Sequence, residues 1–328
     1  LIGWGERMAK DNVVMSNYVK LPNPGLKTYF QRVVSGQPDE YRTTFYKGRT
    51  TQEVLDDWLP QLEKLQHTWP ELLNFEKDLA NKVGPLSVMK PLAERMNDIE
   101  TYYESILLDS SPIDTKAVAA VVSEWVKLRG LTIRSQKRTI QRMKMSTNSG
   151  VPYFMKRSLV RDRYPDSIFS QNMYYFNNAG ELLNADFKFK LAAILGWRGQ
   201  EGGITVDDVK QRVVWMFPLS VNLSELQFYQ PAIELAQIHN LVPAWVSMDS
   251  VDQVITNLFD TKGKQDDIIC TDFSKFDQHF NSDMQDCALQ IISRILNTDR
   301  QSQVWLDRVF PIKYKIPLLY NWNDIKYG

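Results

Sequence analysis

Cysteine, an excess of charge of either sign, and long apolar runs are all scarce in this sequence. Its 328 residues include two cysteines, Cys270 and Cys287, which give no disulfide framework and suit a reducing compartment. Basic and acidic residues number 39 each, so the overall charge does not predict binding to a polyanion. Any such binding must come from local patches of positive charge. We find no apolar run near the length of a membrane span and no signal peptide, so we expect no membrane partner.

What is present is an apolar content of 43%, enough for a sizeable core in one large domain or two to three subdomains. Thr50-x-x-Glu53 is a capping box that predicts the start of a helix. Further helices are predicted over about 91–108 and 114–130, and Ser224 is expected to open another. Residues 1–49 have few periodic apolar stripes, which leaves open an extended arm over other elements or a partly disordered terminus.

The most informative stretch is 266–280. Ile268, Ile269 and Cys270 predict a short buried strand that ends at Asp272, and Asp277 follows five residues later. A helix comes next, with an N-cap in Asn281-Ser282 and a capping box fitted to Ser282-x-x-Gln285. A carboxylate at the end of a core strand is costly unless something compensates it, and a hard cation such as Mg²⁺ would do so. The alternative is that both aspartates are solvated loop residues or helix caps.

Residues 134–163 are strongly basic, with Asp162 as the one acid. A stretch this basic in a neutral chain is typical of a surface that binds polyanions, and Tyr153 and Phe154 interleave with the cations. The alternative is a solvated basic face. The nine basic residues are Arg134, Lys137, Arg138, Arg142, Lys144, Lys156, Arg157, Arg161 and Arg163.

A second group of cations lies within 186–217. Glycines between Gly196 and Gly203 suggest a hairpin tip, and the alternating pattern that follows places Lys210 and Arg212 on the same face of a strand. Two such cations can grip a triphosphate, Arg by a bidentate fork and Lys as a point charge. Arg198 is a weaker candidate for the same role. The alternative is an ordinary exposed strand face.

The stretch Thr-Asp-Phe-Ser-Lys-Phe-Asp-Gln-His-Phe, 271–280, closely resembles motif A of viral RNA-directed RNA polymerases. The whole chain looks like the N-terminal part of a picobirnavirus polymerase, with partitivirus polymerases as the next most similar group. The resemblance implies that Asp272, with Phe273 beside it, binds the catalytic Mg²⁺ or Mn²⁺. It also places Asp277 near the ribose 2′-hydroxyl of the incoming nucleotide, from which a carboxylate can accept a hydrogen bond.

Two further segments carry the resemblance. Residues 198–218 resemble motif F, which implies that Arg212 contacts the triphosphate, with Lys210 and Arg198 nearby. The loop 146–152, rich in small hydroxyl residues, is similar to motif G, which guides the template strand. The residues expected at the RNA template are Asn148, Ser149, Gly150, Pro152, Arg138, Arg142 and Lys144.

The resemblance implies an α/β (α+β) chain with the right-hand fingers–palm–thumb fold. We expect an N-terminal extension over 1–90, fingers over 91–265, the first strand and helix of the palm over 266–297, and a return into the fingers over 298–328. Motif B and the Gly-Asp-Asp motif C are not in this sequence. We therefore expect an N-terminal portion of a longer polymerase, without the thumb, that does not synthesise RNA alone.

The implied function is replication and transcription of a viral, double-stranded RNA genome. The expected partners are template and nascent RNA, nucleoside triphosphates and a capsid protein, in the virion interior and the host cytoplasm. The rival is a non-catalytic viral RNA-binding or capsid-associated protein that uses the basic segment. An aspartyl-phosphate phosphotransferase with Asp272 as nucleophile fits poorly, because Ser274 stands where such enzymes usually carry a second acid.

Overall fold

The computed structural model describes residues 14–37, 48–85, 87–104, 110–163, 189–274 and 276–327. The chain divides into two compact units. The first unit comprises 1–100, 192–216 and 317–326, and the second comprises 101–191, 217–316 and 327–328. The boundaries of these two units differ from those of the subdomains that the polymerase resemblance implies. The subdomain boundaries stay a prediction.

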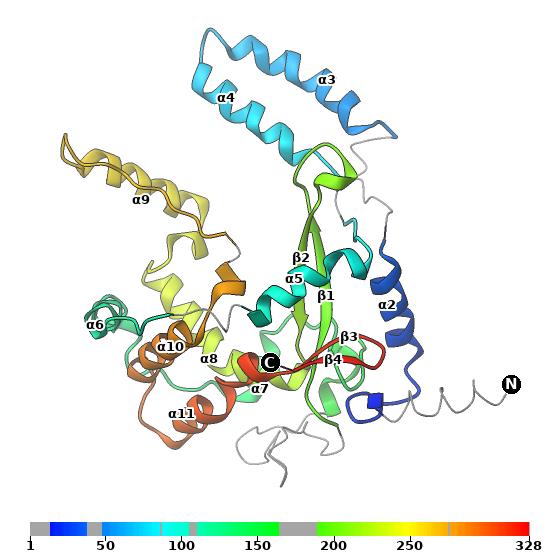
Figure 1. The fold of residues 1–328 in the computed structure, drawn as a ribbon. Coiled ribbons are helices and arrows are strands. Elements are labelled where there is room, and N and C mark those ends of the chain that lie inside the picture. Colours follow the sequence, from blue (N-terminus) through cyan, green and yellow to red (C-terminus); the bar gives the residue numbers. More distant parts are fainter. Residues whose placement is uncertain are drawn as a thin grey trace, which may run out of the picture. The chain divides into compact units, whose positions relative to one another are not determined.

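A four-stranded sheet in the order β2-β1-β3-β4 organises the first unit (Figure 1). β1 (Ala193–Gln200) and β2 (Lys210–Met216) form an antiparallel hairpin. β3 (Leu318–Asn321) pairs in parallel with the start of β1, and β4 (Asp324–Lys326) returns antiparallel to β3. Parallel neighbours need a long crossover connection, and here the chain between β2 and β3 supplies most of the second unit.

The core of the first unit lies where α2 (Pro24–Ser35) packs on β3. Leu26, Phe30 and Val33 form the buried stripe of this helix, at spacings of four and three residues. The part of the expected N-terminal arm that the structure describes is thus a helix, which Asn23 caps at the amide of Leu26. The rest of that arm, 1–13 and 38–47, lies outside the described residues.

Two helices of the first unit, α3 (Thr51–Leu62) and α4 (Pro70–Asp78), form a neighbouring pair (Figure 1). The predicted capping box is confirmed, because the Glu53 amide donates to the Thr50 hydroxyl and the Thr50 amide donates to the Glu53 carboxylate. α5 (Leu92–Glu104) confirms the helix expected from about residue 91, and residues 105–109 lie outside the described part.

The second unit is built around α8 (Leu219–Ile238), a helix with buried residues on several sides. The predicted helix start at Ser224 is wrong, because Ser224 lies inside α8 and its hydroxyl donates to the Ser220 carbonyl. A serine can satisfy its hydroxyl on the preceding turn, so its presence alone does not mark a helix start. The Trp305 indole, fully buried, donates to the Ser224 carbonyl at 2.9 Å.

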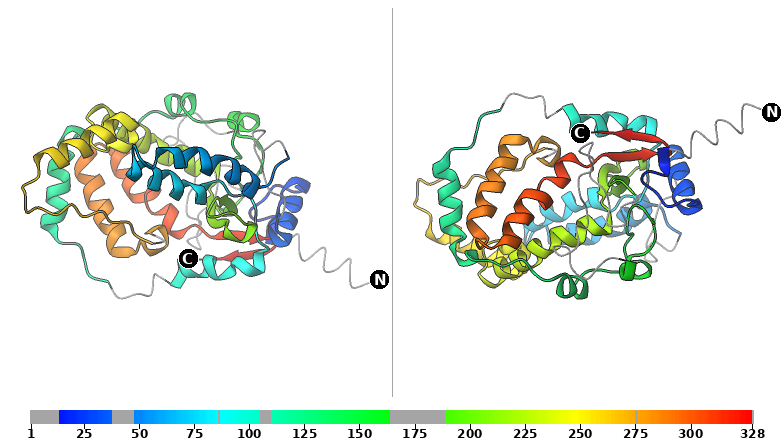
Figure 2. Two further views of the ribbon diagram at one scale, coloured as in Figure 1. Left: turned by 90° about the horizontal axis from the view of Figure 1, so that it is seen from above. Right: turned by 90° about the horizontal axis from the view of Figure 1, so that it is seen from below.

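α8 packs against α7 (Gln136–Gln141), the 3₁₀ turn Val126–Leu128 and the π-helical turn Trp305–Val309. α6 (Thr115–Glu124) starts near Asp114 as predicted, and it lies alongside α10 (Ser282–Ile295) in both views of Figure 2. The capping box predicted at Ser282 is wrong, because Asn281 caps α10 by accepting from the Met284 amide. A 3₁₀ turn follows α6, and Gly130, at φ +84°, donates its amide to the Ile295 carbonyl. The second unit also contains α9 (Met248–Thr261), α11 (Arg300–Val304) and α12 (Ile312–Lys315). None of the helices described has the length and apolarity needed to cross a membrane.

Gly199→Ala should destabilise the first unit. A Cβ at Gly199 would lie 2.7 Å from the Val88 carbonyl oxygen, and backbone cannot move aside as a flexible side chain can. We expect a loss of about 1–3 kcal/mol in the free energy of unfolding, measured by denaturant titration. The matched control is Gly25→Ala in α2, where the nearest atom is 3.9 Å away and alanine should be neutral or stabilising. Equal unfolding curves for both variants would contradict the packing at Gly199.

Candidate functional site

Three cationic side chains share one exposed face of the β1–β2 hairpin. The register places Arg198 opposite Arg212, and Lys210 lies two residues before Arg212 on the same face. The predicted common face of Lys210 and Arg212 is therefore confirmed, and Arg198 joins them. In the described part of the chain, none of the three makes an ion pair with a carboxylate.

The opposite face of the hairpin packs on the segment 87–90 of the same unit. The Gln211 side-chain amide donates to the Val88 carbonyl at 2.9 Å and accepts from the Lys90 amide at 3.1 Å. Gly199, which has no side chain, leaves room for the backbone of Val88. Because side chains alternate along a strand, holding Gln211 inward turns Lys210 and Arg212 outward.

One of the three acidic residues at the hairpin tip, Asp208, is held by hydrogen bonds within the turn. Asp208 accepts from the Thr205 hydroxyl at 2.7 Å and the Thr205 amide at 2.8 Å. The hydrogen bond from the Thr205 hydroxyl, followed by that from its amide, lowers the pKa of Asp208. This charge stabilises the turn and does not pair with the cations of β1 and β2.

The loop that precedes α10 carries Asp272 and Asp277. The buried strand predicted over 268–270 is wrong: the structure has no strand there, and 81% of Ile269 is exposed. A strand must pair its backbone groups with a neighbour, and no described segment pairs with this one. Asp272 is exposed, and Asp277 is exposed in the 3₁₀ turn Phe276–His279.

Asp277 has a partner that the sequence did not reveal. The Tyr102 hydroxyl of α5 donates to Asp277 Oδ2 at 2.5 Å, within the second unit. A carboxylate has two oxygens with several acceptor positions. The Tyr102 contact therefore orients the carboxylate and leaves Oδ1 to accept from another donor.

A chain of aromatic rings connects this loop to the unit's interior. Phe273 and Phe280 each lie with ring centroids 6.0 Å from Phe276, and Phe280 stacks on Tyr314 with an interplanar angle of 11°. Tyr314 in turn contacts Phe310 at 5.5 Å. Ring contacts of this kind are favourable beyond simple burial, so they tether an otherwise exposed loop.

Beneath this chain of rings lies a buried ion pair. Lys313 Nζ is 3.6 Å from Glu225 Oε1, donates to the Tyr229 hydroxyl at 2.8 Å, and lies 4.4 Å from the Phe310 ring centroid. Burial raises the pKa of Glu225 and lowers the pKa of Lys313, and their mutual attraction opposes both shifts. Removing either partner would leave the other charge buried and uncompensated.

The basic segment is partly neutralised inside the second unit. Arg134 and Arg142 both pair with Glu234 of α8. The hydrogen bond from Arg134, followed by that from Arg142, lowers the pKa of Glu234 to about 2. Arg138 and Lys144 are exposed and make no ion pair in the part of the chain that the structure describes.

The loop 146–152 is held by hydrogen bonds within the loop and to residues outside it. Ser149 is fully buried, its amide donates to the Met155 carbonyl at 2.7 Å, and its carbonyl accepts from the Leu219 amide at 2.8 Å. The Gly150 amide donates to the Asn148 side chain at 2.7 Å, and Gly150, at φ +64°, would bring a Cβ within 2.8 Å of the Phe217 carbonyl. The amides of Ser149 and Gly150 are thus occupied. Pro152 is buried, so of the four template residues expected in this loop only Asn148 is partly exposed.

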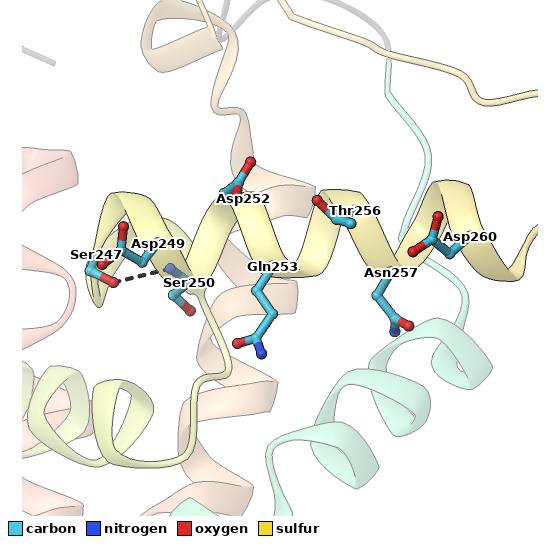
Figure 3. Close-up of a pocket in the computed structure, with 8 residues that line it drawn as sticks. All are labelled: Ser247, Asp249, Ser250, Asp252, Gln253, Thr256, Asn257 and Asp260. Atoms are coloured by element: carbon cyan, nitrogen blue, oxygen red, sulfur yellow. Dashed lines mark hydrogen bonds between the residues drawn. The ribbon is translucent and has the colours of Figure 1, made fainter.

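A hollow along α9 contains none of the predicted site residues (Figure 3). Its three aspartates make it acidic, which suits neither phosphate nor RNA. The lining residues are Ser247, Asp249, Ser250, Asp252, Gln253, Thr256, Asn257 and Asp260.

Comparison with known proteins decides the family. The model of a family described as viral RNA-dependent RNA polymerase matches residues 92–319. The chain belongs to this family. A potential RNA-dependent RNA polymerase of human picobirnavirus (strain Human/Thailand/Hy005102/-) is 52% identical over 316 residues, which are 96% of this chain and 58% of that protein.

Two crystal structures of a human picobirnavirus RNA-dependent RNA polymerase, one of them an insertion-loop deletion mutant, match with a TM-score of 0.86 and 51% identity. Each match covers 96% of this chain, and 61% of the deletion mutant or 59% of the other polymerase. The chain thus spans about three fifths of the length of these relatives. The resemblance to picobirnavirus polymerases and the polymerase fold are confirmed.

Viral polymerases of this family use divalent metal ions, an RNA template and nucleotide substrates. Asp272 and the Phe273 carbonyl offer the hard oxygen ligands that such ions prefer. Among the described residues, however, no group of three or more His, Cys, Asp or Glu side chains could hold a metal ion. The donor set fits part of a polymerase metal site, and the roles of all site residues stay predictions.

Sequence reasoning missed Gln200, Tyr102, Lys313 and Glu225. The alternation that places Lys210 and Arg212 together also applies to β1, so the register of the hairpin would have placed Gln200 beside them. The other three have no sequence signal, because each meets a residue far away in the chain.

Glu234→Gln should lower stability at neutral pH but not in strong acid. A carboxyl whose folded pKa is lowered from 4.5 to about 2 stabilises the fold above pH 4.5 and loses that effect as pH falls toward 2. Because the Glu234 side chain is 35% exposed, we expect a difference of about 1 kcal/mol or less at pH 7. Urea unfolding from pH 7 to 2.5 (roughly the working range for carboxyl titration) measures it.

The control for this experiment is Asp252→Asn on α9, an exposed carboxylate without an ion pair in the described residues. A pH-independent difference between wild type and Glu234→Gln would show that the carboxylate charge does not stabilise the fold.

Proposed function

We propose that this chain serves template-dependent RNA synthesis, in which a 3′-hydroxyl attacks the α-phosphorus of a nucleoside triphosphate and pyrophosphate leaves. The observation that carries the proposal is the hairpin face with Arg198, Lys210 and Arg212. Like charges opposite each other destabilise a sheet, so the arrangement fits a polyanionic ligand better than a structural role. Membership of a polymerase family supports a nucleoside triphosphate as that ligand.

The three cations can bind and neutralise the triphosphate. Arginine offers a planar fork for phosphate oxygens, and lysine adds a compact point charge. Interactions that strengthen as negative charge accumulates on the leaving pyrophosphate lower the barrier. Their exposure leaves them accessible to a nucleotide without a change in the strands.

Asp272 and the Phe273 carbonyl are the proposed metal ligands, with Mg²⁺ as the natural ion and Mn²⁺ as a substitute. Bound divalent ions stabilise the attacking and leaving oxygens in phosphoryl transfer. The role of Asp272 is to bind the ion, and its exposure makes it accessible to one. This chain supplies one carboxylate for that purpose, so we expect RNA synthesis only from a polymerase that provides further ligands.

Asp277 is the proposed contact for the ribose. With Oδ2 held by Tyr102, its remaining oxygen can accept a hydrogen bond from a 2′-hydroxyl, which deoxyribonucleotides lack. For the RNA itself we propose the exposed cations Arg138 and Lys144, with Arg142 shared between RNA and Glu234. The loop 146–152 would then support the template through its rigid shape and Asn148.

In the organism we propose replication and transcription of a double-stranded RNA genome, in the virion interior and host cytoplasm and in association with the capsid protein. Similarity to picobirnavirus polymerases supports this setting. The rival is a non-catalytic RNA-binding protein, which the exposed basic residues alone would suit. Substitution of Asp272 separates the two, because RNA binding does not need its carboxylate.

In a complete polymerase that contains this chain, Asp272→Asn should abolish incorporation dependent on divalent metal ions and leave the melting temperature unchanged. Asparagine keeps the shape but loses the charge that holds a cation, and an exposed side chain contributes little to stability. Primer extension with labelled nucleotide measures the effect. Asp267→Asn, an exposed aspartate of the same loop, is the matched control and should retain activity. Normal incorporation by Asp272→Asn would remove this residue from the metal site.

Replacement of Arg138, Arg142 and Lys144 by alanine should weaken RNA binding and flatten its salt dependence. Each lost contact with single-stranded RNA lowers the slope of log affinity against log salt by about 0.7. We expect a drop of about 1.4 to 2, because Glu234 already engages Arg142. Filter binding of a single-stranded RNA at several salt concentrations measures the slope. The control is a triple alanine variant at the exposed Lys27, Lys64 and Lys264, which should keep the wild-type slope. Equal slopes for the two triple variants would show that the basic segment does not contact the RNA.

A further inference from the structure

Gln200 is the last residue of β1 and lies opposite Lys210 in the hairpin register. Directly opposite residues of an antiparallel pair project to the same face, so Gln200 belongs to the face that carries Arg198, Lys210 and Arg212. It is the one uncharged polar side chain among these four. Its side-chain oxygen accepts from Arg212 Nε at 2.7 Å.

This contact determines which nitrogens of Arg212 remain available. A guanidinium has five N–H groups in a fixed plane, and the two terminal nitrogens form the fork that binds oxyanions. Engaging Nε from the side limits rotation of the guanidinium plane and leaves both terminal nitrogens unoccupied by described residues. The fork is therefore pre-organised, so the guanidinium does not have to be ordered when a ligand binds.

The same contact leaves the face dominated by donors. With one lone pair of the Gln200 oxygen engaged by Arg212, the amide NH₂ of Gln200 still offers two donors to a ligand. Arg198, Lys210 and the Arg212 fork carry donors and no acceptor. Such a set of donors, with no carboxylate paired to it among the described residues, matches a ligand rich in acceptor oxygens.

We propose that Gln200 is a positioning residue for the triphosphate, which acts by orienting the Arg212 guanidinium. This inference rests on the proposed triphosphate-binding role of the hairpin face. Gln200 itself is not required to carry charge; its contribution is to reduce the freedom that Arg212 loses on binding. The effect should therefore depend on Arg212 being present.

The first test compares binding of inorganic tripolyphosphate and ATP to the 328-residue chain by calorimetry. Gln200→Met keeps the length of the side chain and removes the acceptor, and we expect Kd to rise roughly threefold to tenfold, the effect of one hydrogen bond to a charged group at a partly exposed site. The matched control is Gln52→Met on α3, another glutamine whose side chain is hydrogen-bonded, to Asp56 at 2.7 Å. This control should leave Kd unchanged, and both variants should melt as the wild type does.

The second test is a double-mutant cycle, which a purely structural role of Gln200 would not satisfy. Gln200→Met should have no further effect in an Arg212→Ala background and should keep its full effect in an Arg198→Ala background. If Arg212→Ala does not raise Kd, the triphosphate-binding role of the face is itself wrong. If Arg212→Ala raises Kd but Gln200→Met has no effect, or has the same effect in both backgrounds, only the positioning role is overturned.

Discussion

The antiparallel register of β1 and β2 is the constraint on which the proposed nucleotide site depends. It sets Arg198 opposite Arg212 and Gln200 opposite Lys210, so that three cations and one amide share a face. A shift of one residue in either strand would send half of them to the side that packs on residues 87–90. Gln211 and Gly199 prevent that shift, because one hydrogen-bonds this segment and the other leaves room for it.

The second unit faces a different constraint, which is to hold the exposed loop that carries Asp272 and Asp277 without pairing it into a described sheet. Phe280 stacks on Tyr314, and Tyr314 lies above the buried Lys313 and Glu225. Tyr102 adds a hydrogen bond to Asp277. The loop is thus tethered through side chains, whereas a strand would have been held through its backbone. This difference explains how Ile269 can be exposed in a segment whose pattern is typical of core.

Much of the local structure follows from short-range chemistry and was predictable. The capping box at Thr50, the helix start at Asp114 and the outward face of Lys210 and Arg212 depend on residues within a few positions of each other. The errors have equally definite causes. Ser224 bonds to the preceding turn of α8 and does not cap it, and the helix at Pro24 has a buried stripe too short to stand out among its polar neighbours.

The sequence by itself determined the family and the chemical types of the side chains in the proposed site. Motif residues and their spacing are local properties, so they can be read without knowledge of the fold. Only the tertiary structure decided which of these groups are accessible and how they are held. It buried Ser149 and paired Arg142 with Glu234, and it placed Gln200 beside Arg212. These outcomes depend on contacts between residues that strand register and helix packing bring together, and sequence separation gives no measure of such contacts.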